Sequence, residues 1–365
     1  MEQAIKNWDR GLITIILILT LAGSLFFYDA SIIPSIQIYN NPHHYFYDFL
    51  LKNVLTGLLI FFLFSFMSWR WLKKSSNYFL ALIIIMMLLS FLSIFHLPGQ
   101  ASARWFHLGV FNLQPSEFLK FFLILFFSFF YISLGRQLKK RSERVWVAVA
   151  ILAVISLIVF LQPALSNLLI LWAGVIAGII SLRPSWRDLM PFFVLILIFV
   201  VVGISFWGYR LARLKAKFFS HNSASSAINF QQRQTELAIG SGGLFGKGLA
   251  GSQIKLIGIP LMLTDSIFAV YAEEFGFVGS ILMIGSFLYL IGRIFYRGLN
   301  VASDEKKFFA FGIGTWLSIQ IFIHIASNSG LLAATGVPLP FFSDGASSQI
   351  AIMMALGVIN NLEKS

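Results

Sequence analysis

The chain has 365 residues, of which 58% are hydrophobic and 12% are charged. Because a soluble domain carries about a quarter charged residues, this composition excludes a water-soluble globule and indicates a protein embedded in a membrane. The net charge of +12 lies mainly in short loops between apolar runs, which argues against a nucleic-acid partner, and the absence of cysteine excludes disulfides, thiolate nucleophiles and cysteine metal sites.

Apolar runs recur from one end of the chain to the other, and most approach the roughly 20 residues that cross a hydrocarbon core of about 30 Å. We therefore predict an all-α polytopic membrane protein, in contact with membrane lipids, that forms one domain over residues 1–365. The first run follows Lys6 and Arg10, as in a signal peptide, but no small-residue cleavage site is clear, so it is interpreted as a span. About ten transmembrane helices are predicted, at residues 12–28, 54–69, 79–95, 118–134, 145–161, 165–182, 189–206, 267–294, 309–327 and 349–358.

The distribution of lysine and arginine predicts the orientation of these spans. With the N-terminus in the cytoplasm, most basic residues fall in cytoplasmic segments, so both termini are expected there. The long segment between the seventh and eighth spans, residues 208–264, is then extracytoplasmic, and a loop of this length is usually functional. Residues 209–219 interleave basic side chains such as Arg210 and Arg213 with apolar ones, which indicates an interfacial amphipathic helix that either binds anionic groups or presents a solvated cationic face.

Four polar segments interrupt the apolar background, all on the predicted extracytoplasmic side. The first contains Arg104 and Trp105 and continues to Glu117, with Lys120 one turn beyond on nearly the same helix face. Charges inside a span are costly, so Glu117 and Lys120 are expected to pair and frame a polar cavity. Alternatively, Pro115 and Glu117 only begin the helix, as such residues favourably do.

The second segment, residues 240–251, is rich in glycine and contains Lys247. It is not a Walker A loop, because Ser241 occupies the first glycine position and Gly248 follows the lysine. Glycine-rich backbone can present N–H groups to a phosphate or sugar, with Lys247 as a nearby charge. A hinge is the equally weighted alternative.

The third segment contains Thr264 and Asp265 at the end of the long loop, followed by Glu273 and Glu274 in the eighth span. A carboxylate beside hydrocarbon can be poised to accept a proton from a sugar hydroxyl, with a basicity that depends on its burial. Asp265 could instead be a plain N-cap of the following helix. Glu273 and Glu274 point in different directions, so at least one needs a polar partner or water.

The fourth segment, residues 328–348, is dense in glycine, proline and serine and includes Ser343, Ser347 and Ser348. Irregular backbone at membrane depth is tolerated where it is buried in protein or lines a cavity, so more than a connecting turn is expected. The histidines show no metal-ligand spacing, so no metal site is assigned, although carboxylates could still bind a divalent cation.

These four segments, in this order, resemble the SEDS family (shape, elongation, division and sporulation proteins). The segment from Arg104 to Lys120 looks like the family's RW and QPSE..K motifs, and residues 240–251 look like its GSGGLFGKGLG motif. Thr264 and Asp265, with the Glu-Glu-Phe-Gly that follows, match TDFIFA..GEE.GF, and residues 339–348 match the LPxxSYGGSS loop. Four collinear matches make the resemblance specific.

The resemblance implies a ten-span protein of the bacterial plasma membrane and an inverting peptidoglycan glycosyltransferase that polymerises lipid II during cell elongation or division. It implies an extracytoplasmic active face, release of undecaprenyl pyrophosphate, and a class B penicillin-binding protein as transpeptidase partner. The family's essential aspartate falls on Asp265, the expected general base. Substrate contacts are expected from Arg104, Glu117, Lys120, Lys247, Thr264, Ser343, Ser347 and Ser348.

Several positions depart from the family pattern. Ala164 stands where the family has an acidic residue, and Leu261 follows Pro260 where the family's PExxTD stretch has a glutamate. Ser266 replaces a phenylalanine and Asp344 replaces a tyrosine. Because Asp265 is kept, an active but divergent enzyme is favoured over a weakly active regulatory relative. A flippase for lipid-linked sugars would need charges along a path near the bilayer midplane, where this sequence is almost wholly apolar. A non-catalytic scaffold for cell-wall enzymes would not require Asp265.

Overall fold

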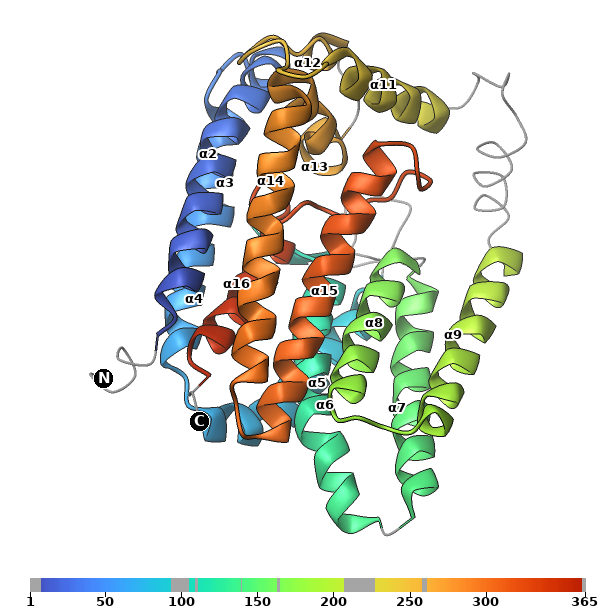
Figure 1. Cartoon of the computed structure of the whole chain (residues 1–365). Helices are drawn as coiled ribbons and strands as arrows, with labels where there is room; N and C mark the ends of the chain where they lie inside the picture. The colour runs from blue at the N-terminus through green and yellow to red at the C-terminus, as the bar shows by residue number, and fades with distance from the viewer. Residues whose placement is uncertain are drawn as a thin grey trace.

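The computed structural model describes residues 8–92, 105–108, 111–138, 140–162, 165–206, 227–257 and 261–362, and these residues are almost entirely helical (Figure 1). Eight helices of the described chain are long and apolar enough to cross a membrane, and two shorter apolar helices accompany them. The prediction of an all-α polytopic fold with about ten transmembrane helices is therefore confirmed. The spanning elements are α2 (Arg10–Tyr39), α3 (His44–Phe49) continuing through the π-helix η1 (Leu50–Leu55) into α4 (Thr56–Phe66), α5 (Trp69–Leu89), α6 (Pro115–Gln137), α7 (Arg141–Leu161), α8 (Leu165–Ser181), α9 (Trp186–Phe206), α14 (Ile267–Leu299), α15 (Asp304–Asn328) and α16 (Ala346–Asn360).

Capping residues move two helix ends away from the limits of the apolar runs. Asp9 begins α2, because its carboxylate accepts a hydrogen bond from the backbone N–H of Leu12 at 2.9 Å. Ser68 begins α5 in the same way by accepting from the N–H of Trp71 at 3.3 Å, so the helix starts at Trp69 rather than near residue 79. The basic residues expected in a loop after the second span, such as Lys73, therefore lie on the first turns of α5.

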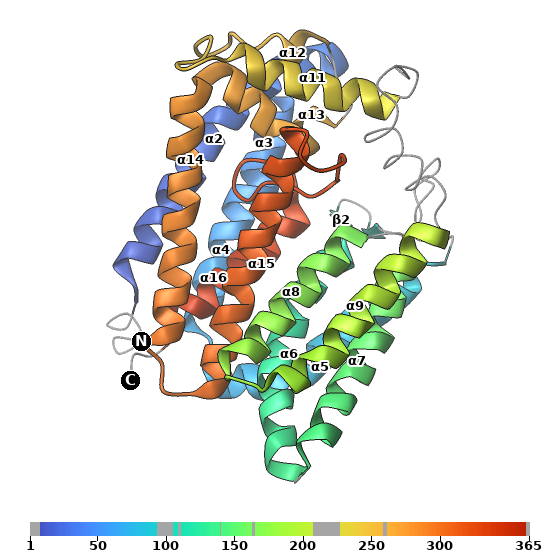
Figure 2. The same ribbon diagram turned by 45° about the vertical axis from the view of Figure 1, so that its right-hand side comes forward.

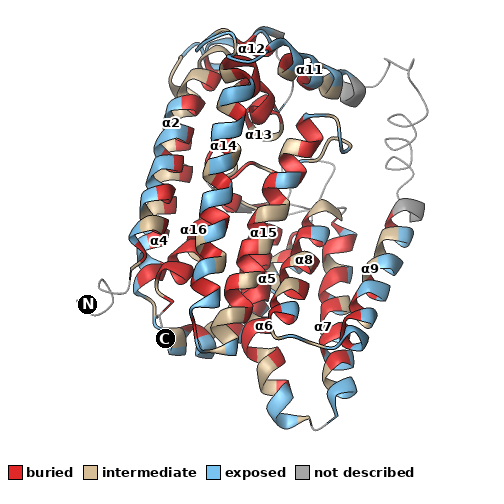
Figure 3. Cartoon of the chain, viewed as in Figure 1, coloured by how far each residue is buried: buried red, intermediate tan, exposed pale blue. Residues whose placement is uncertain are grey.

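The helices form one bundle with α6, α8, α15 and α16 at its centre (Figures 1 and 2). Helices α2 and α4 lie at one side and α7 and α9 at the other, and buried residues face inwards on each (Figure 3). Small residues permit the closest approach: a Cβ added to Gly174 of α8 would lie 3.2 Å from the carbonyl oxygen of Gly312 of α15, and one on Gly23 of α2 would lie 2.2 Å from that of Phe341. Close packing through small residues is typical of helices in a bilayer, where no hydrophobic drive brings them together.

The two ends of the bundle differ in structure. At the end where α2 begins and α16 ends, called here the terminal end, Arg293 pairs with Asp9 at 2.5 Å and Arg297 donates to the carbonyl oxygen of Asn360 at 2.7 Å. The opposite end, called here the pocket end, carries the short helices α11 (Ala227–Ser241), α12 (Ile254–Ile257) and α13 (Met262–Asp265) of the long loop (Figure 2). Residues 209–219, predicted as an interfacial helix, lie outside the described residues.

A small antiparallel hairpin precedes α6. Strands β1 (Phe106–Leu108) and β2 (Phe111–Leu113) pair with Phe106 opposite Leu113. The hairpin leads directly into Gln114, whose N–H donates to the hydroxyl of Ser347 at 3.0 Å. This contact ties the start of α6 to the start of α16.

Candidate active site

Asp265 ends the one-turn helix α13, immediately before the long helix α14. Leu261 begins this turn in the left-handed conformation at φ 57°, and the N–H of Asp265 donates back to the carbonyl oxygen of Leu261 at 2.8 Å. Asn328, at the end of α15, donates its amide N–H to the carbonyl oxygen of Asp265 at 2.9 Å. The backbone of Asp265 is thus held by its own helical turn and by the end of α15, which is distant in the sequence.

The interpretation of Asp265 as a plain N-cap is wrong. Ser266, not Asp265, occupies the N-cap position of α14. Within the described residues, the Asp265 carboxylate accepts no hydrogen bond and pairs with no cation. Its oxygens are therefore available to a ligand.

The loop before α16 holds α13 in place. The hydroxyl of Ser343 donates to the carbonyl oxygen of Thr264 at 2.7 Å and accepts from the N–H of Leu339 at 2.9 Å. The N–H of Asp344 donates to the carbonyl oxygen of Leu263 at 3.0 Å. The predicted site residues Thr264 and Ser343 therefore meet beside Asp265, where the hydrogen bond between them supports the backbone of α13.

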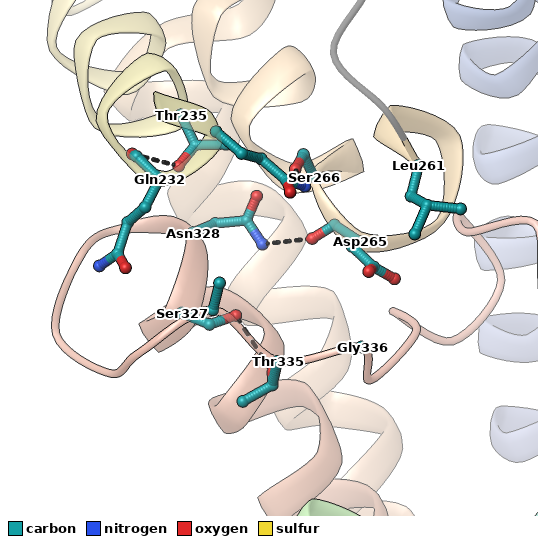
Figure 4. Close-up of a pocket in the computed structure, with 11 residues that line it drawn as sticks. Gln232, Thr235, Leu261, Asp265, Ser266, Ser327, Asn328, Thr335 and Gly336 are labelled. Atoms are coloured by element: carbon teal, nitrogen blue, oxygen red, sulfur yellow. Dashed lines mark hydrogen bonds between the residues drawn. The ribbon is translucent and has the colours of Figure 1, made fainter. Parts of the chain in front are cut away.

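A pocket of about 230 Å³ opens beside Asp265 (Figure 4). Most of its lining residues are polar, and Asp265 is the one charged residue among those described. They come from α11, from the α13–α14 junction and from the end of α15 with the loop that follows. Gly336 faces the carboxylate closely, since a Cβ built there would lie 3.7 Å from Asp265 Oδ2. The lining residues are Gln231, Gln232, Thr235, Leu261, Asp265, Ser266, Ser327, Asn328, Ala334, Thr335 and Gly336.

Burial raises the pKa of Asp265 from 3.8 to about 7. Burial disfavours the charged form of a carboxyl group, and no neighbouring cation among the described residues offsets the effect. A carboxyl group with a pKa near neutrality can both accept and return a proton at physiological pH. The pocket thus combines side chains that can form hydrogen bonds with one carboxyl group whose pKa is near neutrality.

Two further predicted site residues form a separate, buried ion pair. Lys120 Nζ lies 2.7 Å from Glu117 Oε2, and the two side chains are 0% and 2% exposed. Lys120 also donates to Gln320 Oε1 at 3.3 Å, and Gln320 Nε2 donates to Ser348 Oγ at 3.1 Å. The prediction that Glu117 and Lys120 pair is confirmed, and Ser348 joins them through Gln320 in a network between α6, α15 and α16.

The glycine-rich segment packs against α14, where Lys247 pairs with Glu273 at 2.6 Å. The same carboxylate also accepts from the hydroxyl of Ser252 at 2.6 Å. The helix is kinked at Gly276, with φ 64° and ψ −162°, and a Cβ there would lie 2.3 Å from the backbone nitrogen of Gly246. Gly242 and Gly246 of this segment permit close backbone approach to α14, since a Cβ on either would lie 2.2 Å or less from a carbonyl oxygen of that helix. Glu273 has the polar partner that its position in the span required.

Not every predicted contact residue falls in the described structure. Arg104 lies outside the described residues, as do Arg210 and Arg213. Within the described chain no three histidine or acidic side chains come together as metal ligands, so the divalent cation stays a prediction.

The residues of α11 that line the pocket were not predicted from the sequence. Gln231 donates to Ser266 Oγ at 3.2 Å and Gln232 donates to the carbonyl oxygen of Leu332 at 3.3 Å, so this helix bridges the start of α14 and the loop after α15. The neighbouring glutamines of residues 231–234 were the available signal, because such a polar cluster in a membrane protein needs a polar environment.

The architecture first defines the class: an α-helical multi-pass membrane protein with an unpaired carboxylate in a polar pocket at one end of the bundle. The sequence then gives the family. Residues 9–365 match the model of the FtsW, RodA and SpoVE family, described as cell cycle protein, and the chain belongs to this family. The resemblance to the SEDS family is thereby confirmed.

Curated relatives and solved structures agree with this membership. The chain is 30% identical over 359 residues to the probable peptidoglycan glycosyltransferase FtsW of Coxiella burnetii, covering 97% of this chain and 95% of the relative. It is 31% identical to that of Wigglesworthia glossinidia brevipalpis, covering 96% and 92%. A chain from a peptidoglycan synthase complex that coordinates polymerization and crosslinking superposes with a TM-score of 0.75 at 25% identity, covering 96% of each chain. The Thermus thermophilus rod shape determining protein RodA, at 24% identity and a TM-score of 0.68 over 97% of this chain and 96% of that one, shares the fold.

Proposed function

We propose that Asp265 is the general base of a glycosyl transfer that extends a glycan strand from lipid II. The chain is a multi-pass protein of the bacterial inner membrane and a peptidoglycan glycosyltransferase, like its curated relatives. The observation that supports Asp265 is its position: an unpaired carboxylate, with a pKa raised to about 7, in the polar pocket. No other acidic residue lines this pocket within the described structure.

The proposed step is a single inverting displacement. The 4-hydroxyl of the acceptor sugar loses its proton to Asp265 as its oxygen forms a bond to the anomeric carbon of the donor. The bond from that carbon to the pyrophosphate oxygen breaks, and undecaprenyl pyrophosphate leaves with the electron pair. The amides of Gln231, Gln232 and Asn328 and the hydroxyl of Thr335 are placed to orient the sugars by hydrogen bonds.

Negative charge develops on the departing pyrophosphate and requires cations. Lys120 is wholly buried against Glu117, so we assign it to holding α6 and α15 together. The side chain of Lys247 is 28% exposed, and it could exchange Glu273 for a phosphate oxygen. We propose Lys247 and Arg104 for this role.

The pocket end is proposed to be extracytoplasmic and both termini cytoplasmic. The support is the positive-inside rule. The start of α5, the end of α6 and the start of α9 lie away from the pocket end (Figure 1), and these helix ends carry Arg70, Arg136 and Arg187. A class B penicillin-binding protein is the proposed partner, supported by the structural similarity to a chain of a synthase complex that couples polymerization with crosslinking.

The test is polymerisation of labelled lipid II by the purified protein together with a class B penicillin-binding protein. We expect glycan strands from the wild type and none from Asp265→Ala, while Glu143→Gln, which removes an exposed carboxylate at the other end of the bundle, retains activity. Polymer from Asp265→Ala would refute the assignment of the base. No polymer from correctly folded wild type would refute the proposed polymerase and favour lipid transport or a scaffold.

A further inference from the structure

A second pocket, of about 340 Å³, opens at the terminal end of the bundle, remote from Asp265. It lies where α6 ends, α7 begins and the α8–α9 turn passes the start of α15. Three of its lining residues are arginines, and its only acidic lining residue is Asp304. The lining residues are Tyr131, Ile132, Gly135, Arg136, Arg141, Arg144, Ile179, Leu182, Pro184 and Asp304.

The arginines are not all neutralised by neighbouring carboxylates. Arg141 pairs with Asp188 at 2.5 Å, and Asp188 is further occupied by the N–H and hydroxyl of Ser185, both at 2.9 Å. Arg136 and Arg144 pair with no acidic residue of the described chain. Other charged groups on these segments, Lys140 paired with Glu143 at 3.5 Å and the exposed Arg183 and Arg187, leave the surroundings cationic.

Arg144 is held in a defined position at the pocket. Its guanidinium lies over the ring of Tyr131, 5.0 Å from the centroid, and its buried Nε has no hydrogen-bond partner in the described structure. Gly135 makes room for it, since a Cβ at that position would lie 2.6 Å from Arg144 Nη1. A partly exposed guanidinium that lines the pocket and pairs with no carboxylate of the described chain suits a phosphate oxygen, which accepts charge-assisted hydrogen bonds.

The surroundings favour a lipid as the source of that phosphate. Trp146 of α7 and Trp186 of α9 each follow a lining residue of the pocket by two positions, and they are 62% and 68% exposed, as tryptophans at a membrane interface are. Along the same two helices, Val154 and Leu197 are 63% and 62% exposed and offer an apolar face to acyl chains. Basic pockets between helix ends are suited to anionic head groups.

We propose that this pocket binds the phosphate head group of an anionic phospholipid between Arg136 and Arg144, with its acyl chains along α7 and α9. The site is separate from the glycosyl-transfer pocket and does not depend on the function assigned there. Binding here would tie the ends of α6, α7, α8 and α15 to the leaflet at the terminal end.

The test is binding of phosphatidylglycerol to the full chain in neutral detergent, followed by native mass spectrometry during titration. The variant Arg136→Gln/Arg144→Gln, which removes both charges, is expected to weaken binding about tenfold or more, because each basic group near an anionic lipid contributes to the free energy of binding. The matched control Arg70→Gln/Lys74→Gln removes two exposed charges from α5 and should weaken it less than about threefold. Gly135→Ala keeps every charge but displaces Arg144, so it should also weaken binding.

Competition identifies the source of the phosphate. Phosphatidylcholine and inorganic phosphate should leave bound phosphatidylglycerol in place. Displacement by millimolar inorganic phosphate alone would show a free-anion site and overturn the lipid assignment. Equal losses in the pocket variant and the α5 control, with unchanged melting temperatures, would show general surface attraction and overturn the proposed site.

Discussion

The raised pKa of Asp265 makes a stability prediction that is independent of any substrate. In the folded protein the carboxyl group keeps its proton up to about pH 7, whereas in the unfolded chain it loses the proton near its ordinary value of 3.8. Between these values the folded state binds more protons than the unfolded state, so this group makes the folded state progressively less stable as pH rises. Above pH 7 the full destabilisation by the charged, buried carboxylate of Asp265 is present.

The magnitude follows from the shift. A difference of about three pKa units corresponds to about 4 kcal/mol, and partial exposure of the carboxylate to solvent reduces this to about 2 to 4 kcal/mol. Asp265→Asn keeps the shape of the side chain without its charge. We therefore expect the variant to be more stable than the wild type at pH 8, with a difference that shrinks by pH 4.

Thermal unfolding of the purified full chain in detergent at pH 4, 6 and 8 measures this difference. Glu236→Gln on α11 is the matched control, because its carboxylate is exposed and its removal has no burial cost to relieve. If Asp265→Asn is less stable than the wild type at pH 8, the Asp265 carboxylate has a stabilising partner, and burial alone does not determine its pKa.

Three other predictions concern the frame of the site. Ser343→Ala removes the hydrogen bonds to Thr264 and Leu339 and should lower the free energy of unfolding by about 1 to 3 kcal/mol. Because Ser343 supports the backbone of α13, the variant should lower kcat more than it raises KM, and an unchanged kcat would contradict this supporting role. Gly276→Ala places a Cβ 2.3 Å from the backbone of Gly246 at a residue with positive φ, so the yield of folded protein in the membrane should fall sharply. The control Gly285→Ala has open space around it and should be tolerated. Equal yields of the two variants would contradict a kink that requires glycine. Lys120→Met leaves Glu117 buried and unpaired, and should lower the free energy of unfolding by about 3 to 5 kcal/mol. In a thermal unfolding assay, Glu117→Gln/Lys120→Met should recover part of this loss. A double variant less stable than the single one would contradict loss of the ion pair as the cause.

The sequence predicts the number of helices well because apolar length is a local property. It places helix ends less well, since a single cap such as Ser68 extends α5 through residues that hydropathy assigns to a loop. The second span likewise begins at His44 rather than near residue 54, because α3 and η1 continue into α4 across polar residues that include Lys52. Ends of this kind depend on hydrogen bonds that an apolar average does not register.

The site itself was predicted only in part. Asp265 could be singled out as a carboxylate beside hydrocarbon, and Glu117 with Lys120 follow from helix spacing. That Ser343 supports α13, or that Lys247 meets Glu273, depends on contacts between segments remote in sequence. The pocket wall formed by Gln231 and Gln232 depends on the placement of α11 over the end of α15, which no local pattern specifies.

Asp265 is proposed to act as a base with a pKa near neutrality in glycan polymerisation. The most direct measurement is the pH dependence of kcat/KM for lipid II, with an unrelated glycosyltransferase on the same substrate as a control for ionisation of lipid II. With a pKa of about 7, kcat/KM should rise about tenfold between pH 6 and 8. Gln231→Lys, which adds a cation to the pocket, should move the midpoint of this rise to lower pH. A flat profile over this range, or full activity in Asp265→Asn, would show that Asp265 is not the general base.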